Sequence, residues 1–205
     1  MRRRAGVALA PLLAGLLLAA SLAPWGLWPL AFVGAALLYR CLDGRSLWGR
    51  LVSGWLAGLG CFVPGLWWAA HFNWYGAAVL MVVESLSMAL AAAVCVPPIG
   101  VVAFTGAFTL AEWVRSTWPF GGLPLGGVFL GQAQGPLLAT ARLGGPLLLT
   151  ALVWLGGAGL GVLWGRRPLR AGAAIAPAAP RERLWALAAS AQFRSGIRGS
   201  LHCNE

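Results

Sequence analysis

The sequence contains no lysine and has little charge of either sign. Its fifteen Lys+Arg residues are all arginines, it has five acidic residues, and charged residues make up 10% of the 205 positions. Hydrophobic residues make up 60%, and the mean hydropathy is +0.78. So few polar side chains cannot cover the surface of a water-soluble globule. The composition therefore excludes a soluble enzyme and predicts an integral membrane protein.

Motifs for metals, cofactors and hydrolytic chemistry are also missing. No GxSxG elbow, P-loop, dinucleotide fingerprint or HExxH motif occurs. The cysteines form no CxxC pair and have no histidine at zinc-ligand spacing; they are Cys41, Cys61, Cys95 and Cys203. We expect neither a metal nor a cofactor. The net charge of +10 could indicate nucleic acid, but the arginines cluster at the ends of apolar runs, so we expect no nucleic-acid partner.

Long uncharged runs define the predicted topology. Residues 5–39, 51–83, 85–111 and 143–165 contain no charged side chain, and about 20 apolar residues cross a bilayer. The first run is interrupted by Pro24, Trp25, Gly26 and Pro29, which predicts a helical hairpin whose second arm is short. Arginines precede and follow this run, and two crossings place both groups in the cytoplasm. A cleavable signal peptide is the weaker alternative.

Four further crossings are predicted at about residues 51–70, 77–96, 99–113 and 143–165. The polar and aromatic stretch 71–76 fits the outer headgroup level. The glycine- and proline-rich stretch 115–142 fits an outer loop or a re-entrant segment. Six crossings return Arg166, Arg167 and Arg170 to the inside. We therefore predict an all-α, polytopic transmembrane bundle of about six helices with its N-terminus inside.

Glycines recur at four-residue spacing in two of these runs. They are Gly54 and Gly58, and Gly157, Gly161 and Gly165. Such stripes let a second helix approach closely, although a glycine-rich composition alone could also produce them. The bundle is predicted to occupy residues 1–170. Residues 171–205 change in character, and we expect an atypical tail there, disordered or frameshifted, without a seventh crossing.

Ionisable side chains within apolar runs are costly to bury and are candidates for function. The candidates for lipid binding or a structural role are Glu84, Glu112 and Arg115, with His71 at the outer boundary. Glu112 and Arg115 share a helix face, which predicts an ion pair. The pair either braces the start of the outer loop or lets Arg115 attract a lipid phosphate while Glu112 orients it.

The other two candidates carry weaker signals. We predict that Glu84 is a hydrogen-bonded packing residue near Ser85 and Ser87 rather than a proton relay, because no second carboxylate lies near it in sequence. His71 beside Asn73 is a weak indication of a catalytic base.

Several stretches, in order, resemble the membrane domain of the bacterial apolipoprotein N-acyltransferases. They are residues 22–33, LAPWGLWPLAFV; residues 54–68, GWLAGLGCFVPGLWW; residues 111–115, AEWVR; residues 120–126, FGGLPLG; and residues 131–137, GQAQGPL. The resemblance covers about residues 5–165, and the lysine-free, arginine-rich composition looks like an actinobacterial member. The resemblance implies a multi-pass protein of the bacterial inner membrane and the transfer of an acyl chain from a membrane phospholipid to the N-terminal cysteine of a diacylated lipoprotein.

In that family a seventh helix leads to a nitrilase-like domain whose glutamate, lysine and cysteine catalyse the transfer. A chain without lysine cannot assemble this triad, and we assign no role to Cys203. We therefore expect a truncated acyltransferase that is inactive alone, through a frameshift, a premature stop, a gene-model error or a natural membrane-only paralogue. The alternatives are a non-enzymatic membrane module that binds lipid or a separately encoded catalytic domain and, less favoured, a small transporter.

Overall fold

The structure is a computed structural model that describes residues 2–95, 99–118, 122 and 125–166. Side chains are described from residue 9 to residue 165 within these ranges. All of them belong to the unit Met1–Arg167. The predicted tail at 171–205 and the predicted boundary at residue 170 lie outside the described residues and stay predictions.

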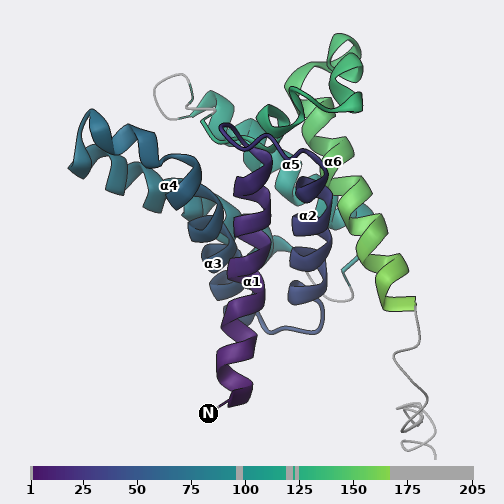
Figure 1. Ribbon diagram of the computed structural model, residues 1–205. Coiled ribbons are helices and arrows are strands. Elements are labelled where there is room, and N and C mark those ends of the chain that lie inside the picture. The colour runs from purple at the N-terminus through teal and green to yellow at the C-terminus, as the bar shows by residue number, and fades with distance from the viewer. Residues whose placement is uncertain (1, 96–98, 119–121, 123–124, 167–205) are drawn as a thin grey trace, which may run out of the picture. The chain divides into compact units, whose positions relative to one another are not determined.

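Six α-helices and no strand are found among the described residues (Figure 1). The helices are α1 (Arg2–Ser21), α2 (Pro29–Leu42), α3 (Leu47–Gly65), α4 (Trp74–Val94), α5 (Val101–Thr117) and α6 (Ala141–Arg166). Three short 3₁₀ helices accompany them: η1 (Trp67–His71), η2 (Val128–Gln132) and η3 (Pro136–Thr140). The predicted all-α bundle of about six helices is confirmed.

The first apolar run forms the predicted hairpin. Helix α1 ends at Ser21, and Gly26 in the following turn has φ of 64°, a value that glycine adopts without strain. Pro29 is the first residue of α2, where its missing N–H costs no hydrogen bond. At about 1.5 Å per residue, the 14 residues of α2 cover about 21 Å, less than the bilayer core. The predicted short second arm is therefore present.

Helices α3 and α4 each begin at a residue whose side chain caps the helix. Helix α3 begins before residue 51, where the predicted crossing starts. The Ser46 hydroxyl accepts from the Gly49 N–H at 3.3 Å, so α3 starts at Leu47 and includes Arg50. Arg50 is buried, and its guanidinium donates to the carbonyls of Arg45 and Ala93, each at 3.1 Å. These bonds offset the cost of burying the charge. Within the predicted outer turn, the Asn73 side chain caps α4.

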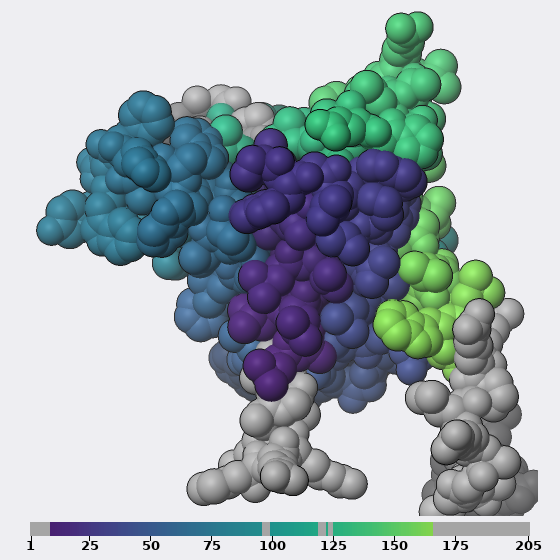
Figure 2. Space-filling model, viewed as in Figure 1, coloured from purple at the N-terminus to yellow at the C-terminus, as the bar shows by residue number. Residues whose placement is uncertain are grey.

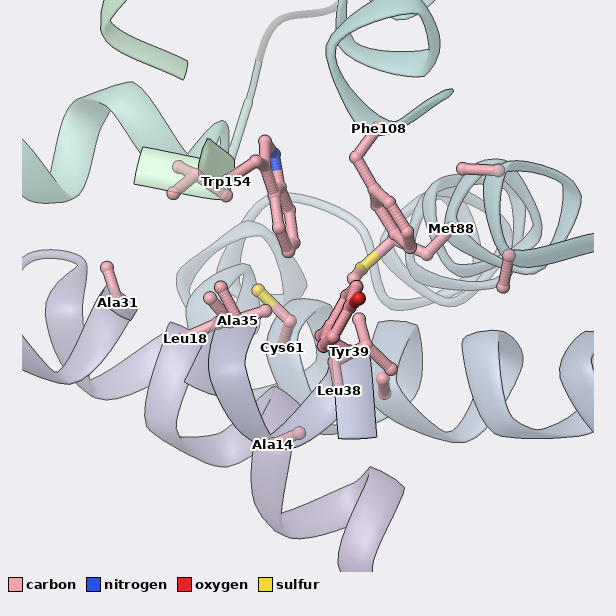
Figure 3. Packing of buried hydrophobic residues seen from close by; sticks show 14 of the residues in the cluster. Ala14, Leu18, Ala31, Ala35, Leu38, Tyr39, Cys61, Met88, Phe108 and Trp154 are labelled. Carbon is pink, nitrogen blue, oxygen red and sulfur yellow. The ribbon is translucent and has the colours of Figure 1, made fainter. Parts of the chain in front are cut away.

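The helices contact one another in a closed circuit. Around the ring the order is α1, α2, α6, α5, α4, α3 and back to α1. Figure 3 shows side chains from all six helices meeting in the middle, among them Leu18, Leu38, Cys61, Met88, Phe108 and Trp154. Phe108 and Trp154 pack with ring centroids 4.5 Å apart, which joins α5 to α6.

Both predicted glycine stripes lie at helix contacts. A Cβ on Gly58 would lie 2.6 Å from Ser85 Cα on α4, and a Cβ on Gly157 would lie 2.3 Å from Ala35 Cβ on α2. Neither position has room for a side chain, so these glycines let the backbones approach closely. Gly15 and Gly60 play the same role between α1 and α3, outside any stripe that the sequence analysis identified.

Most of the described arginines that flank the helices lie at one end of the bundle, whereas Arg142, at the start of α6, lies at the other. Helix α1 begins, and α6 ends, at the same end (Figure 1). Near that end Gly165 of α6 lies against the Arg40 guanidinium of α2, and Arg50 at the start of α3 bonds to Ala93 at the end of α4. Two segments are long and apolar enough by themselves to cross a membrane, Trp74–Val94 and Pro136–Gly165.

Gly157 and its near neighbour Gly159 offer a matched test of the helix contact. We expect Gly157→Leu to destabilise the bundle by about 1–3 kcal/mol, because the side chain must displace Ala35. Gly159→Leu is expected to be neutral or slightly stabilising, since nothing lies within 4 Å of a Cβ there and leucine is the better helix former. Thermal unfolding in detergent measures both, and equal losses would contradict the assigned contact.

Candidate functional site

Three of the four candidate residues come together in a buried charged cluster. One nitrogen of the Arg115 guanidinium, Nη2, donates to both carboxylate oxygens of Glu112, each at 2.9 Å. The other, Nη1, donates to the carboxylate of Glu84 on α4. Glu84, Glu112 and Arg115 are 4%, 6% and 8% exposed. The predicted Glu112–Arg115 ion pair is thus present, and Glu84 extends it into a cluster that joins α4 to α5.

An aromatic ring and a glycine turn enclose the cluster. The Arg115 guanidinium carbon lies 4.9 Å from the centroid of the Phe62 ring on α3, within cation–π range. A Cβ on Gly126 would lie 3.1 Å from that ring, and a Cβ on Gly127 would lie 2.6 Å from Glu112 Oε1. The outer loop therefore packs directly on the cluster, and these two positions have no room for a side chain.

The charges in the cluster favour the bracing role over phosphate binding. Two carboxylates surround one guanidinium, so the fully ionised cluster carries a net charge of −1. A lipid phosphate at Arg115 would meet two carboxylates at short range, which is repulsive in a site with little water. The cluster therefore satisfies its own arginine, and we interpret it as a connection between α3, α4, α5 and the outer loop.

Glu84 is buried and hydrogen-bonded, but the sequence analysis did not predict the partner of its carboxylate. The Ser85 hydroxyl donates to the Met81 carbonyl at 2.6 Å, and the Ser87 hydroxyl donates to the backbone carbonyl of Glu84 at 2.6 Å. Neither hydroxyl serves the Glu84 carboxylate, which instead accepts from Arg115, 31 residues away. No local pattern reveals this pair, because it depends on how α4 lies against α5.

His71 lies apart from the cluster. It is exposed on η1, and its Nδ1 pairs with the Trp68 carbonyl at 3.2 Å. Asn73 accepts from the N–H groups of Tyr75 and Gly76 with its side-chain oxygen. The weakly indicated pairing of His71 with Asn73 is therefore not formed.

Gln132 is a structural residue that the sequence analysis did not single out. It is fully buried, and its side-chain amide donates to the Trp28 carbonyl at 3.2 Å. Gly131 beside it would place a Cβ 2.6 Å from Ser21 Oγ. These contacts attach the outer loop to the turn between α1 and α2, while Gly126 and Gly127 attach it to the charged cluster. The predicted glycine-rich outer loop covers the ends of several helices.

The described part of the chain shows no catalytic or metal-binding constellation. No three His, Cys, Asp or Glu side chains among the described residues lie close enough to hold a metal ion. The described cysteines, Cys41, Cys61 and Cys95, are buried. The arrangement is that of a helical membrane domain, packed through glycines, braced by one ion cluster and covered by a fixed loop at one end.

The chain belongs to the apolipoprotein N-acyltransferase family. The sequence model of the family described as "Apolipoprotein N-acyltransferase N-terminal domain" matches residues 14–159. This range contains helices α2 to α5 completely, the second part of α1 and most of α6, with the charged cluster and the outer loop. The family predicted from the sequence motifs is confirmed.

Curated relatives agree with this assignment. The chain is 31% identical over 197 residues to an apolipoprotein N-acyltransferase of Rhizobium rhizogenes, covering 78% of this chain and 36% of the relative. It is 30% identical over 223 residues to the apolipoprotein N-acyltransferase of Azotobacter vinelandii, and the match covers 94% of this chain and 43% of the relative. It is 32% identical over 166 residues to the apolipoprotein N-acyltransferase of Pseudomonas paraeruginosa, and the match covers 72% of this chain and 32% of the relative. The chain thus spans well under half the length of these relatives.

The cluster predicts an order of stability among single variants. We expect Arg115→Leu to cost about 3–5 kcal/mol, because two buried carboxylates lose their counter-charge. Glu84→Gln is expected to cost much less, since Arg115 keeps its two bonds to Glu112 and the net charge falls to zero. Arg115→Lys is expected to lie between them, because a lysine ammonium cannot reproduce the forked contact. Thermal unfolding of the three variants measures the order, and a larger loss for Glu84→Gln than for Arg115→Leu would refute it.

Proposed function

We propose that this chain is the membrane-embedded scaffold of an apolipoprotein N-acyltransferase. The observation that carries the proposal is the family match over residues 14–159, which includes the charged cluster and the loop that covers it. In this proposal the complete enzyme takes an acyl chain from a membrane phospholipid and transfers it to the N-terminal cysteine of a diacylated lipoprotein. The scaffold positions the catalytic part at the outer surface of the inner membrane.

The described residues support a scaffold rather than a catalyst. The transfer expected of the family uses a glutamate, a lysine and a cysteine, and these 205 residues include no lysine. Glu84 and Glu112 are both engaged by Arg115, so neither carboxylate is available as a base. We propose that the chain transfers no acyl group by itself and requires a catalytic part.

We further propose that all six helices cross the inner membrane, with the N-terminus in the cytoplasm. The distribution of charge supports this orientation, because Arg40, Arg45 and Arg50 lie near the end where α1 begins and α6 ends. The other end carries fewer arginines: Arg142 at the start of α6, and Arg115, which is neutralised by Glu84 and Glu112. An excess of arginine on one side is the pattern of cytoplasmic loops.

Labelling of single cysteines tests this orientation. The variants Asp43→Cys and Gln134→Cys are each made in a background in which Cys203 is replaced by serine. Asp43 lies between α2 and α3, Gln134 lies in the outer loop, and both positions are exposed. We expect a membrane-impermeant maleimide to label the Gln134→Cys variant in intact spheroplasts. The Asp43→Cys variant should react only after permeabilisation. The reverse pattern would place the N-terminus outside and overturn the orientation.

A chimaera tests the scaffold function. Residues 1–166 of this chain replace the matching membrane region of the Pseudomonas paraeruginosa relative, in cells depleted of their own enzyme. We expect the chimaera to restore N-acylation, read by mass spectrometry of a lipoprotein's N-terminal peptide, and this chain alone to restore none. The control chimaera carries Arg115→Leu, which should reduce the amount of inserted protein. A chimaera that inserts normally but leaves the lipoprotein diacylated would contradict the scaffold role.

A further inference from the structure

A groove opens between the outer ends of α1 and α3. It has a volume of about 630 Å³, within the range of small-molecule sites. Its lining is almost entirely apolar and includes Leu16, Trp25, Val63, Trp67 and Trp68, with His71 as its single titratable side chain. Figure 2 shows, beside the outer part of α1, the projecting segment in blue that carries the aromatic wall. The groove is separate from the charged cluster.

Aromatic contacts fix one wall of the groove. The Trp67 ring packs edge-on against Trp74 at the start of α4, with centroids 6.0 Å apart. The Trp68 ring packs in the same way against Phe72, also at 6.0 Å. Edge-to-face pairs of this kind hold ring orientation, although both tryptophans are about half exposed. The wall is therefore preformed and faces outward from the bundle, where lipid is the surrounding medium.

His71 lies at the polar end of this groove and is available to a ligand. Because the Trp68 carbonyl can only accept, Nδ1 of His71 must donate to it. The second nitrogen, Nε2, is left as the ligand-binding atom, and in an imidazolium this nitrogen is a donor. No acidic residue lines the groove. An anionic group at His71 therefore meets no opposing carboxylate, in contrast to Arg115, which is held by two.

The dimensions suit one acyl chain that enters from the outer leaflet. Leu16 lies five residues before the end of α1, about 7 Å along the helix axis. The groove thus reaches about halfway down one leaflet of a bilayer whose hydrocarbon core is about 30 Å thick. Its upper end carries Trp25, Trp67 and Trp68, residues that favour the headgroup level. An apolar slot with a basic group at its interfacial end matches an amphiphile with an acyl chain and a phosphate.

From these observations we infer that the groove between α1 and α3 binds one phospholipid, with an acyl chain along Leu16 and Val63 and the headgroup phosphate at His71 Nε2. The assignment rests on the proposed function for the class of lipid. It adds the position on this chain at which the lipid binds, and it assigns the contact with the headgroup phosphate to His71 rather than to Arg115.

Photolabelling of the full-length chain tests the site. The chain is reconstituted in nanodiscs of phosphatidylethanolamine with a small fraction of phosphatidylethanolamine carrying a diazirine in its acyl chain, and labelled residues are mapped by mass spectrometry. We expect Val63 and Trp67 to be labelled several-fold more than Val102, which is exposed on α5 and lines no groove. Leu16→Trp fills the groove and should remove this excess. Leu13→Trp, a similarly exposed position on α1 that does not line the groove, should leave it unchanged.

A second comparison tests the headgroup contact. His71→Ala should lower groove labelling by the phospholipid probe several-fold, and His71→Arg should retain it. A diacylglycerol probe without phosphate should label the groove equally in all three proteins. Equal labelling of groove and α5 positions would show annular lipid only, and labelling that is indifferent to His71 would remove the phosphate contact; either result overturns the inference. Labelling does not require acyl transfer, so this outcome is separable from failure of the chimaera.

Discussion

The guanidinium of Arg115 connects more parts of this structure than any other described polar group. It pairs with Glu112 on its own helix and with Glu84 on α4, and it lies over the Phe62 ring of α3. The outer loop then rests on Phe62 and Glu112 through Gly126 and Gly127. A buried arginine is tolerated only when its donors are paired. The position of α4, the end of α5 and the path of the loop therefore depend on one another through this side chain.

The rest of the bundle is held by close approach of backbones. Lipid tails are as apolar as leucine, so helices in a bilayer gain little from the hydrophobic effect and associate through packing and hydrogen bonds. Gly58 against α4, Gly157 against α2 and Gly60 against α1 each remove the side chain that would keep the two helices apart. Dispersion contacts are short-ranged, so this removal increases the attraction between helices. The closed circuit of helix contacts follows from several such interfaces.

Local features of the sequence were sufficient to predict much of the helix arrangement and part of the charged cluster. The proline and glycine interruption after Ser21 predicted the hairpin, the glycine stripes predicted two helix contacts, and the spacing of Glu112 and Arg115 predicted their pair. The partner of Glu84 was not predicted, because it depends on the register between the two antiparallel helices α4 and α5. Gln132 was missed for the same reason: its partner, Trp28, lies 104 residues away, and nothing near Gln132 indicates that its amide is buried.

The two basic candidates at the outer end, Arg115 and His71, differ in what surrounds them, and the roles that we propose for them follow from this difference. Arg115 is always charged but is enclosed by two carboxylates, an aromatic ring and a glycine turn, so its charge is used within the protein. His71 lies exposed beside an apolar groove whose lining includes no acidic residue. Affinity for an external anion depends on the unpaired charge that a ligand can reach, not on the strength of the base. A search for arginine alone would therefore select Arg115, whereas the contacts of each side chain are the basis on which we infer that His71 recognises the lipid.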